Sequence, residues 1–304
     1  MTETEAAGID ILHCAREMTG TPSRRPSSGE NMQAQIPASP PEGGTQDVMI
    51  IGAGLSGVGM ACRLKMSCPD TTFTVLESRE RIGGTWDLFR YPGVRSDSDM
   101  HTLGYPFRPW SNGDAIADGE AIRHYIEETA YEYGVDRYIR FGMTVMAADW
   151  SSETRLWALT IKNGDELHIV TCRCLVACAG YYEYDQGYTP DFPGIENFNG
   201  EIVHPQYWPE DISLKNRHVV VIGSGATAIT LVPALAKLAG HVTMLQRSPT
   251  YVVAQDKDSP LARGLRRMTP RRFADSIIRW QSILLSLAQY GFARRLPKRR
   301  RGHA

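Results

Sequence analysis

Two stretches of the chain repeat the same order of apolar and polar positions. Each opens with a short, mostly apolar run, residues 48–51 and 218–222, and continues through closely spaced glycines into helical spacing. Each then ends in a second apolar run, residues 73–76 and 242–245. Continuous apolar runs of this length predict strands buried on both faces. The order of strand, glycine turn, helix and strand therefore predicts two parallel β-α-β units in an α/β fold.

The glycines of the first unit form the pattern G-x-G-x-x-G at Gly52, Gly54 and Gly57. The first glycine permits a tight turn, the second lets the backbone approach a pyrophosphate, and the third allows close packing of helix on strand. The helix N-terminus offers free N–H groups and a positive dipole end to the phosphates. Glu77 ends the second strand, where a carboxylate accepts hydrogen bonds from ribose hydroxyls. The glycine pattern alone often marks only a tight loop, but strand, helix and acid together indicate a dinucleotide site.

The second unit carries the related pattern G-x-G-x-x-A, which opens a predicted helix at residues 229–238. Its second strand is followed by Gln246 and Arg247 in place of an acid. A carboxylate at this position favours a free ribose 2′-hydroxyl, whereas an arginine suits a 2′-phosphate. The difference favours FAD at the first unit and NADP at the second. The alternative for Arg247 is an ordinary surface arginine.

The segments outside the two units also show regular patterns. Helical spacing predicts a helix at residues 118–133 and an amphipathic helix at residues 273–290. Alternating positions predict a meander with a hairpin turn at residues 163–165, and its strands are 139–141, 144–147 and 157–161. Residues 175–180 are typical of a further buried strand. Residues 1–46 are rich in Pro, Ser and Gly beyond a weakly helical start (9–18), which predicts a disordered extension.

Composition narrows the function classes. Charged residues make up 22% of the chain and the net charge is −1, so nothing global favours a nucleic-acid or membrane partner. The chain has six cysteines, none in a C-x-x-C pair, which predicts reduced thiols and no metal site; Cys172, Cys174 and Cys178 are expected to be buried. The N-terminus lacks the pattern of a signal peptide, and no apolar run is long enough to span a bilayer. These features together predict a cytoplasmic location.

Two longer motifs carry a family resemblance. Residues 83–97 match G-G-x-W-x4-Y-P-G-x3-D, and residues 198–209 match F-x-G-x3-H-x3-W-P. A tryptophan near a turn is usually ordinary packing, and a lone histidine in a linker usually has no catalytic task. With the two glycine patterns, however, residues 47–290 resemble class B flavoprotein monooxygenases of the Baeyer–Villiger type. Trp208 favours this branch over the related N- and S-oxygenating flavin monooxygenases, which usually carry tyrosine there.

The resemblance implies two Rossmann-like, three-layer (ββα/βαβ) dinucleotide-binding domains. An FAD-binding domain would occupy residues 47–190, and an inserted NADP-binding domain with the start of a helical insertion would occupy residues 191–304. The implied reaction is FAD- and NADPH-dependent insertion of one atom of O2, through a C4a-peroxyflavin, into a small ketone to give an ester. S-oxygenation of a thioamide or sulfide is a further implied reaction, and N- or S-oxygenation alone is the alternative chemistry.

The family's catalytic arginine and most of its substrate pocket are expected beyond Ala304. A fold incomplete at its C-terminal end is therefore expected, and a fragment that only binds nucleotide is the second hypothesis.

The resemblance also assigns roles to individual residues. The expected FAD contacts are Ser56, Glu77, Gly84, Thr85, Trp86, Asp87, Leu88 and the backbone of Val145. The expected NADP contacts are Arg95, Ser96, Asp97, Gly223, Ser224, Gly225, Ala226, Thr227, Gln246 and Arg247. The expected catalytic residues are Asp97 and His204. Asp97 is expected to lie near the flavin and to help position the nicotinamide and the catalytic arginine. His204 is expected to couple domain movement to turnover rather than to transfer a proton.

Overall fold

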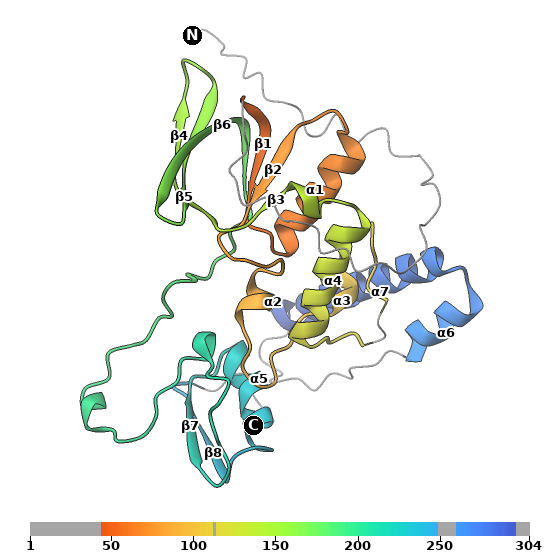
Figure 1. Ribbon diagram of the computed structural model, residues 1–304. Helices are drawn as coiled ribbons and strands as arrows, with labels where there is room; N and C mark the ends of the chain where they lie inside the picture. The colour runs from red at the N-terminus through yellow and green to blue at the C-terminus, as the bar shows by residue number, and fades with distance from the viewer. Residues whose placement is uncertain (1–43, 112–113, 249–259, 296–304) are drawn as a thin grey trace. The chain divides into compact units, whose positions relative to one another are not determined.

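The computed structural model describes residues 44–111, 114–248 and 260–295 (Figure 1). The chain forms two compact units that interleave along the sequence. The first unit ends its opening segment at Gly84 and resumes at Ile126–Tyr181; the second contains Thr85–Tyr125 and the chain from Tyr182 onward. The expected functional boundary at residue 190 stays a prediction. The predicted extension, except for its last three residues, lies outside the described residues.

The first unit is built on a six-stranded sheet in the order β3-β2-β1-β6-β5-β4 (Figure 1). Its parallel part joins β1 (Gln46–Ile51) to β2 (Phe73–Leu76) and to β6 (Glu166–Ala177), and β2 to β3 (Ile139–Arg140). Its other part is an antiparallel meander in which β5 (Leu156–Asn163) pairs with both β4 (Met143–Ser151) and β6. The two parts meet in the long strand β6.

Two sequence predictions for this sheet are wrong. Residues 139–141 do not belong to the meander, because the chain turns at Gly142, with φ of 68°, and β3 pairs in parallel with β2. The separate strand expected at residues 175–180 is the end of β6, which has already paired with β5 and continues alongside β1. The antiparallel pairing also contains an irregularity in β4 between Val145 and Ala147.

Helix α1 (Leu55–Ser67) connects β1 to β2 and buries Gly57, Val58, Ala61 and Cys62. A separate core cluster forms around the sheet, and its buried members are Met49, Leu76, Met143, Leu159, Ile161 and Cys172. Of the three cysteines expected to be buried, only Cys172 is fully so, and burial raises the pKa of its thiol to about 11. Cys174 and Cys178 are half-buried, because they lie near the end of β6.

Helix α4 (Gly119–Glu132) matches the helix predicted at residues 118–133. Its N-terminal part, through Tyr125, belongs to the second unit, and the rest belongs to the first. Beyond it, the short 3-10 helix η2 (Asp136–Tyr138) leads into β3.

The second unit contains a two-stranded parallel sheet, β7 (His218–Ile222) with β8 (His241–Leu245), joined by α5 (Ala226–Leu235). One face of this sheet packs into a cluster with α5, through Val219, Val221, Val242 and Met244. The other face exposes Val220, Ile222 and Leu245, each by more than half. The prediction that both faces are buried is therefore wrong for the part of the chain that is described. An apolar run is necessary for two-sided burial, but a second covering layer must also be present.

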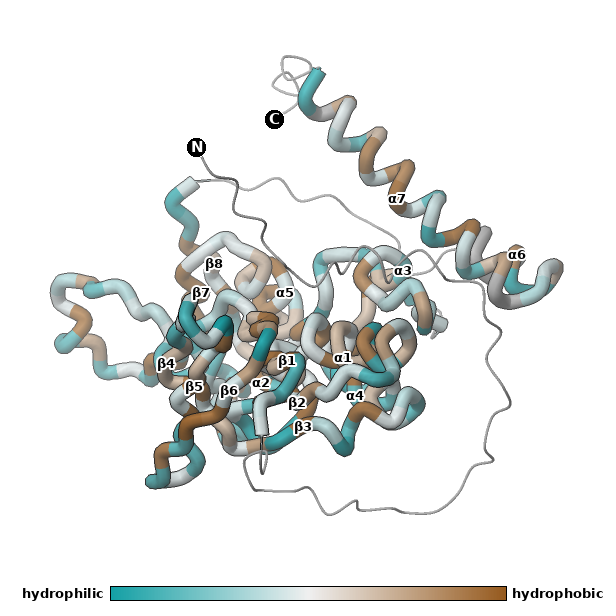
Figure 2. Tube along the Cα trace, turned by 90° about the horizontal axis from the view of Figure 1, so that it is seen from above, coloured by the Kyte–Doolittle hydropathy of each residue, from teal (hydrophilic) through white to brown (hydrophobic). Residues whose placement is uncertain are grey.

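The rest of the second unit is mostly helical and irregular. Its short helices are α2 (Thr85–Leu88), α3 (Met100–Leu103), η3 (Ile195–Asn197) and η4 (Pro205–Tyr207). The helix predicted at residues 273–290 is longer in the structure, as α7 (Arg271–Arg295), and follows α6 (Pro260–Met268). Hydrophobic bands recur along α7 in Figure 2. Of the helices in the described ranges, none has the length and apolarity that a membrane span requires.

Candidate nucleotide-binding sites

The first glycine turn is closely packed against neighbouring backbone. Gly52 has φ of 97°, a conformation that L side chains rarely adopt, and a Cβ there would lie 2.6 Å from the carbonyl oxygen of Cys178. A Cβ at Gly57 would overlap the carbonyl oxygen of Gly52. Gly54 is the N-cap of α1 and contributes no side-chain cap to the helix. The turn thus presents backbone, rather than side chains, where the resemblance expects a pyrophosphate.

Glu77 lies at the end of β2 and is 3% exposed. Its Oε2 accepts a hydrogen bond of 2.7 Å from the N–H of Ala53, inside the glycine turn. Its Oε1 accepts one of 2.9 Å from the N–H of Arg79. An ionised carboxylate has about four acceptor positions, so the same oxygens retain capacity for ribose hydroxyls. The arrangement fits the adenosine half of FAD, because the acid is fixed directly against the phosphate turn.

Val145 is linked to Glu77 through the backbone of β4. The carbonyl oxygen of Glu77 accepts a bond of 2.9 Å from the N–H of Met143, the first residue of β4, and Val145 follows two residues later. Val145 also lies at the irregularity of β4, where pairing with β5 shifts. Such irregularities redirect backbone groups away from regular pairing. The placement is compatible with the expected backbone contact to adenine, which stays a prediction. Ser56, the remaining expected contact in the first unit apart from Gly84, is exposed in the first turn of α1.

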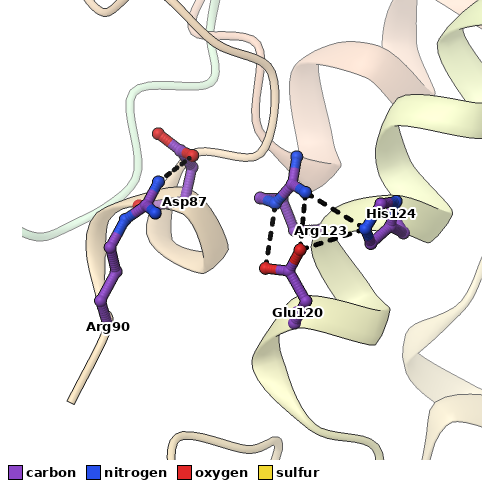
Figure 3. Close-up of polar contacts among 5 residues, drawn as sticks. All are labelled: Asp87, Arg90, Glu120, Arg123 and His124. Carbon is purple, nitrogen blue, oxygen red and sulfur yellow. Dashed lines mark hydrogen bonds and ion pairs between the residues drawn. The ribbon is translucent and has the colours of Figure 1, made fainter.

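The other expected FAD contacts, Thr85 to Leu88, form α2 in the second unit. Asp87 is buried, and its Oδ1 accepts a hydrogen bond of 3.0 Å from Nη2 of Arg90 (Figure 3). Leu88 belongs to the core cluster around α5. Trp86 is half-buried beside Gly119, where a Cβ would lie 3.6 Å from its ring. Asp87 and Leu88 therefore have structural tasks of their own, and their contact with FAD stays a prediction.

A polar group on the first turns of α4 is also drawn in Figure 3. Glu120 accepts a hydrogen bond of 2.7 Å from Nη2 of Arg123 and lies 3.1 Å from Nε2 of His124. The hydrogen bond from Arg123 is the main cause that lowers the pKa of Glu120. An acid at a helix N-terminus also interacts favourably with the helix dipole. Because Glu120 is two-thirds exposed, this group stabilises the start of α4 and forms no enclosed site.

The segment that contains Arg95, Ser96 and Asp97 is held along its backbone. Arg95 forms an isolated antiparallel bridge with Asp118, and the N–H of Ser96 donates a bond of 2.9 Å to the carbonyl of Ala117. The Oγ of Ser96 donates to the carbonyl of Ser98, which leaves the intervening Asp97 exposed. The backbone is therefore fixed while the carboxylate of Asp97 faces outward, as a ligand contact requires.

The second glycine turn is more open than the first. A Cβ at either Gly223 or Gly225 would have no neighbouring atom within 4 Å. The third position of the pattern is Ala228, which is buried in α5. Gly225 is the N-cap of α5, with Ala226 and Thr227 in the first turn, and Ser224 lies within the turn itself. The arrangement fits a pyrophosphate at the N-terminus of α5.

Gln246 and Arg247 follow β8 and are both exposed. The N–H of Gly223 donates a hydrogen bond of 2.8 Å to the carbonyl of Leu245, so the glycine turn and the end of β8 are adjacent. The structure therefore brings Gly223 and the residues before Gln246 together in one unit, as the β-α-β pattern predicts. The guanidinium of Arg247 is accessible to an anionic ligand.

His204 is the N-cap of η4, and its Nδ1 accepts a hydrogen bond of 3.2 Å from the N–H of Gln206. A Cβ at Gly187 would overlap its ring, so a second stretch of chain packs directly on it. Trp208 packs against the core cluster around α5. These contacts make His204 part of the framework of the linker, in keeping with an expected role other than proton transfer. The coupling role itself stays a prediction.

Gln206 is a residue of this linker that the sequence did not single out. Its side chain is 6% exposed, and its Nε2 donates hydrogen bonds of 2.7 and 3.1 Å to the carbonyls of Glu183 and Tyr184. The hydroxyl of Tyr207 donates a further bond of 2.9 Å to Tyr184. The sequence gives no reason to expect that Gln206 is buried, because glutamine is ordinarily exposed.

Two strand–glycine turn–helix–strand units, one ending in a buried carboxylate and the other in glutamine and arginine, define a dinucleotide-binding α/β protein. Comparison with known proteins narrows this class. Residues 45–279 match the family described as flavin-binding monooxygenase-like.

Similar proteins agree with this match. The FAD-containing monooxygenase EthA of Mycobacterium tuberculosis (strain ATCC 25618 / H37Rv) is 52% identical over 256 residues, which cover 84% of this chain and 52% of EthA. A solved structure of OTEMO in complex with FAD and NADP is 30% identical, with a TM-score of 0.59 over 67% of this chain and 40% of OTEMO. Cyclohexanone-bound cyclohexanone monooxygenase is 29% identical, with a TM-score of 0.60 over 69% of this chain and 40% of that chain.

The chain belongs to the flavin-binding monooxygenase-like family. It spans about half the length of the curated relatives it matches. Its α/β architecture is that of the dinucleotide-binding part of the Baeyer–Villiger monooxygenases among its structural neighbours.

Proposed function

We propose that the protein is an FAD- and NADPH-dependent monooxygenase that inserts one oxygen atom from O2 into a small ketone. The first unit binds FAD and the second binds NADPH. Bound FAD, reduced by NADPH, supplies the electrons with which O2 is activated. The protein's own residues bind both nucleotides and orient them.

The observation that carries the proposal is the contrast between the two strand ends. Glu77 is a buried carboxylate fixed by two backbone N–H groups, which suits the free ribose hydroxyls of FAD. Arg247 is an exposed guanidinium at the corresponding position of the second unit, which suits a 2′-phosphate. A protein that binds one nucleotide of each kind has the cofactor pair of a flavin monooxygenase.

Other residues take supporting roles in the proposal. Gly54 and the first turn of α1 hold the FAD pyrophosphate, and the first turn of α5 holds that of NADPH. Asp97 would help to position the nicotinamide, on a segment whose backbone is fixed by the bond from Ser96 to Ala117. His204, held with Gln206 in the braced linker, couples domain movement to turnover.

The test begins with the purified chain incubated with FAD and then dialysed. The proposal expects retained flavin absorbance, oxidation of NADPH in air when cyclohexanone is added, and formation of the lactone, detected by mass spectrometry. A chain that retains no flavin contradicts the proposal. A chain that retains flavin and binds NADP+ but forms no lactone and no sulfoxide from a methyl sulfide binds nucleotides without turnover. Sulfoxide without lactone identifies N- or S-oxygenating chemistry instead.

A further inference from the structure

Helix α3 is held by an arginine of α7. Nη1 of Arg279 donates hydrogen bonds of 2.9 Å to the carbonyl of His101 and 2.7 Å to the carbonyl of Gly104. These carbonyls lie in the last turn of α3 and at its C-cap. A cation at a helix C-terminus satisfies carbonyls that have no partner within the helix. Through these two hydrogen bonds, Arg279 fixes the position of α3.

A second arginine, Arg266 of α6, holds the loop that follows α3. Its Nη2 donates a hydrogen bond of 2.7 Å to the carbonyl of Trp110, and its Nε donates one of 2.9 Å to Oδ1 of Asp275 in α7. Arg266 is 16% exposed and Asp275 is 6% exposed, so the ion pair is largely removed from water. Trp110 is buried, and its Nε1 donates 2.8 Å to the carbonyl of Asp114. The α6–α7 pair thus holds residues 101–110 at both ends through the hydrogen bonds of Arg279 and Arg266, and we call this set of bonds the grip.

Helix α3 is joined directly to the segment with Asp97. The side chain of Asp99 caps α3 by accepting a bond of 3.1 Å from the N–H of Thr102. The N–H of Met100 donates 2.7 Å to the carbonyl of Ala115, beside the bond from Ser96 to Ala117. A shift of α3 would therefore change the backbone that carries Asp97.

His101 lies inside this grip. It is 8% exposed, and its Nε2 has no hydrogen-bond partner among the described residues. The charged groups that face it are Arg266 from α6, Asp275 from α7 and Asp99 from the start of α3. Arg279 contacts its carbonyl. A proton on this ring would place a positive charge in a buried site that holds two arginines as well as the carboxylates of Asp99 and Asp275, so burial is the main cause that opposes it.

We propose that Arg266 and Arg279 are positioning residues for the NADP-contacting segment 95–97, acting through α3, and that protonation of His101 loosens their grip. The inference rests on the proposed function, because it takes residues 95–97 as an NADP contact. It assigns the α6–α7 pair a task in cofactor binding that the glycine patterns do not reveal.

The direction of the pH effect follows from burial. Burial first, and then Arg266, lower the pKa of His101 below its ordinary value of 6.5, while Asp99 and Asp275 oppose the shift. The folded state therefore binds fewer protons than the unfolded state in the window just below pH 6.5, so the grip is stable above pH 6.5 and loses stability as the pH falls through this window.

The experiment compares Arg279→Ala with the matched control Arg294→Ala, which removes an exposed arginine from the end of the same helix. Two readouts are taken: NADP+ affinity by calorimetry, and hydrogen exchange of the amides of Met100 and Gly104. We expect about tenfold weaker NADP+ binding and faster exchange at both amides in Arg279→Ala, with FAD affinity unchanged and no change in the control. Unchanged affinity and exchange in Arg279→Ala would overturn the inference.

Two further variants keep the test decisive. If Arg279→Ala does not fold, Arg279→Lys is used, since a lysine reaches the same carbonyls with a less suited geometry and should give an intermediate loss of affinity. His101→Gln should remove the extra weakening of NADP+ binding between pH 7.5 and pH 5.5, whereas a purely structural histidine would leave the profile unchanged. The comparison between variant and parent cancels the titration of the ligand's own phosphate, whose second pKa is about 6. If the parent chain binds no NADP+, the proposed function fails, while the exchange readout still decides whether the grip exists.

Discussion

The two glycine turns share a sequence pattern but differ in their surroundings. The first is enclosed: a Cβ at Gly52 or Gly57 would meet backbone, and the carboxylate of Glu77 is buried against the turn. The second is open, with free space at Gly223 and Gly225 and exposed residues at the end of β8. The difference follows from the sheets, because β1 has neighbours on both sides, whereas β7 pairs only with β8 among the described residues. The same motif can therefore form a buried turn or a solvent-accessible turn, depending on which segments cover it.

The largest effect that separates the two turns should come from Gly57→Ala. The added Cβ would overlap the carbonyl of Gly52, which is backbone rather than the flexible end of a side chain. We expect a loss in unfolding free energy on the order of 3 kcal/mol or more, together with loss of FAD binding, measured by urea unfolding and flavin retention.

The matched change in the second turn is Ala228→Gly, at the equivalent position. This variant removes a buried methyl from α5 and should cost about 1 kcal/mol, mainly through helix propensity. A cost for Gly57→Ala no larger than this would contradict the enclosure of the first turn.

A second test of the comparison is Glu77→Gln. Both carboxylate oxygens accept backbone N–H groups, and an amide has only one oxygen, so one N–H would face another donor. A buried donor left without its acceptor costs about 1–3 kcal/mol, and loss of a charge-assisted contact to ribose should weaken FAD binding by about 10- to 100-fold. Flavin titration and urea unfolding measure both. The control is Glu120→Gln, an exposed acid outside the turn; an equal response in the two variants would remove Glu77 from the site.

How much of this could be predicted from the sequence depends on whether a feature is local. The glycine turns, both pairs of strands, α4 and the existence of α7 follow from patterns within about 15 residues. The pairing of β3 with β2 and the exposed face of β7 do not, because they depend on which strands meet across long stretches of chain. The roles of Gln206, Arg266 and Arg279 could not be predicted for a related reason. Each side chain donates hydrogen bonds to backbone carbonyls far away in the sequence, and every residue has such a carbonyl, so these bonds leave no sequence pattern.

Arg247→Ala sharpens the comparison at the second turn. The guanidinium is exposed and fits a 2′-phosphate, so its removal should raise the Kd for NADP+ by about 10- to 30-fold and leave that for NAD+ nearly unchanged. Calorimetry with both nucleotides measures the ratio. Arg217→Ala is the control, since this exposed arginine precedes the opposite end of β7 and lies 3.7 Å from Glu201. A parallel loss of affinity for NAD+ and NADP+ would assign Arg247 a general role and would leave the cofactor preference to other residues.

The smallest expected effect concerns how the strands of each unit begin. In the first unit Asp47, at the start of β1, accepts hydrogen bonds of 2.7 and 3.0 Å from the hydroxyl and the N–H of Thr72, just before β2. In the second unit the corresponding connection is made by other contacts: the N–H of His241 donates a bond of 3.1 Å to the carbonyl of Arg217, and the rings of His218 and His241 lie 5.5 Å apart. The first unit should therefore lose this carboxylate contact in acid.

The hydroxyl of Thr72, followed by its N–H, lowers the pKa of Asp47 below its ordinary value of 3.8. Stability from this contact is thus fully present above pH 3.8 and is lost as the pH falls through the lower folded pKa. Because the side chain is 36% exposed and screened by solvent, Asp47→Asn should cost well under 1 kcal/mol at pH 7.

The measurement is urea unfolding at pH 7 and at pH 3. It is followed through fluorine-labelled tryptophans, since Trp150 and Trp157 report on the first unit and Trp208 on the second. A difference between parent and variant that shrinks at pH 3, and only at the first two tryptophans, is the expected outcome. An equal shift at Trp208 would mean that the two units unfold as one, and their separate stabilities could then no longer be compared.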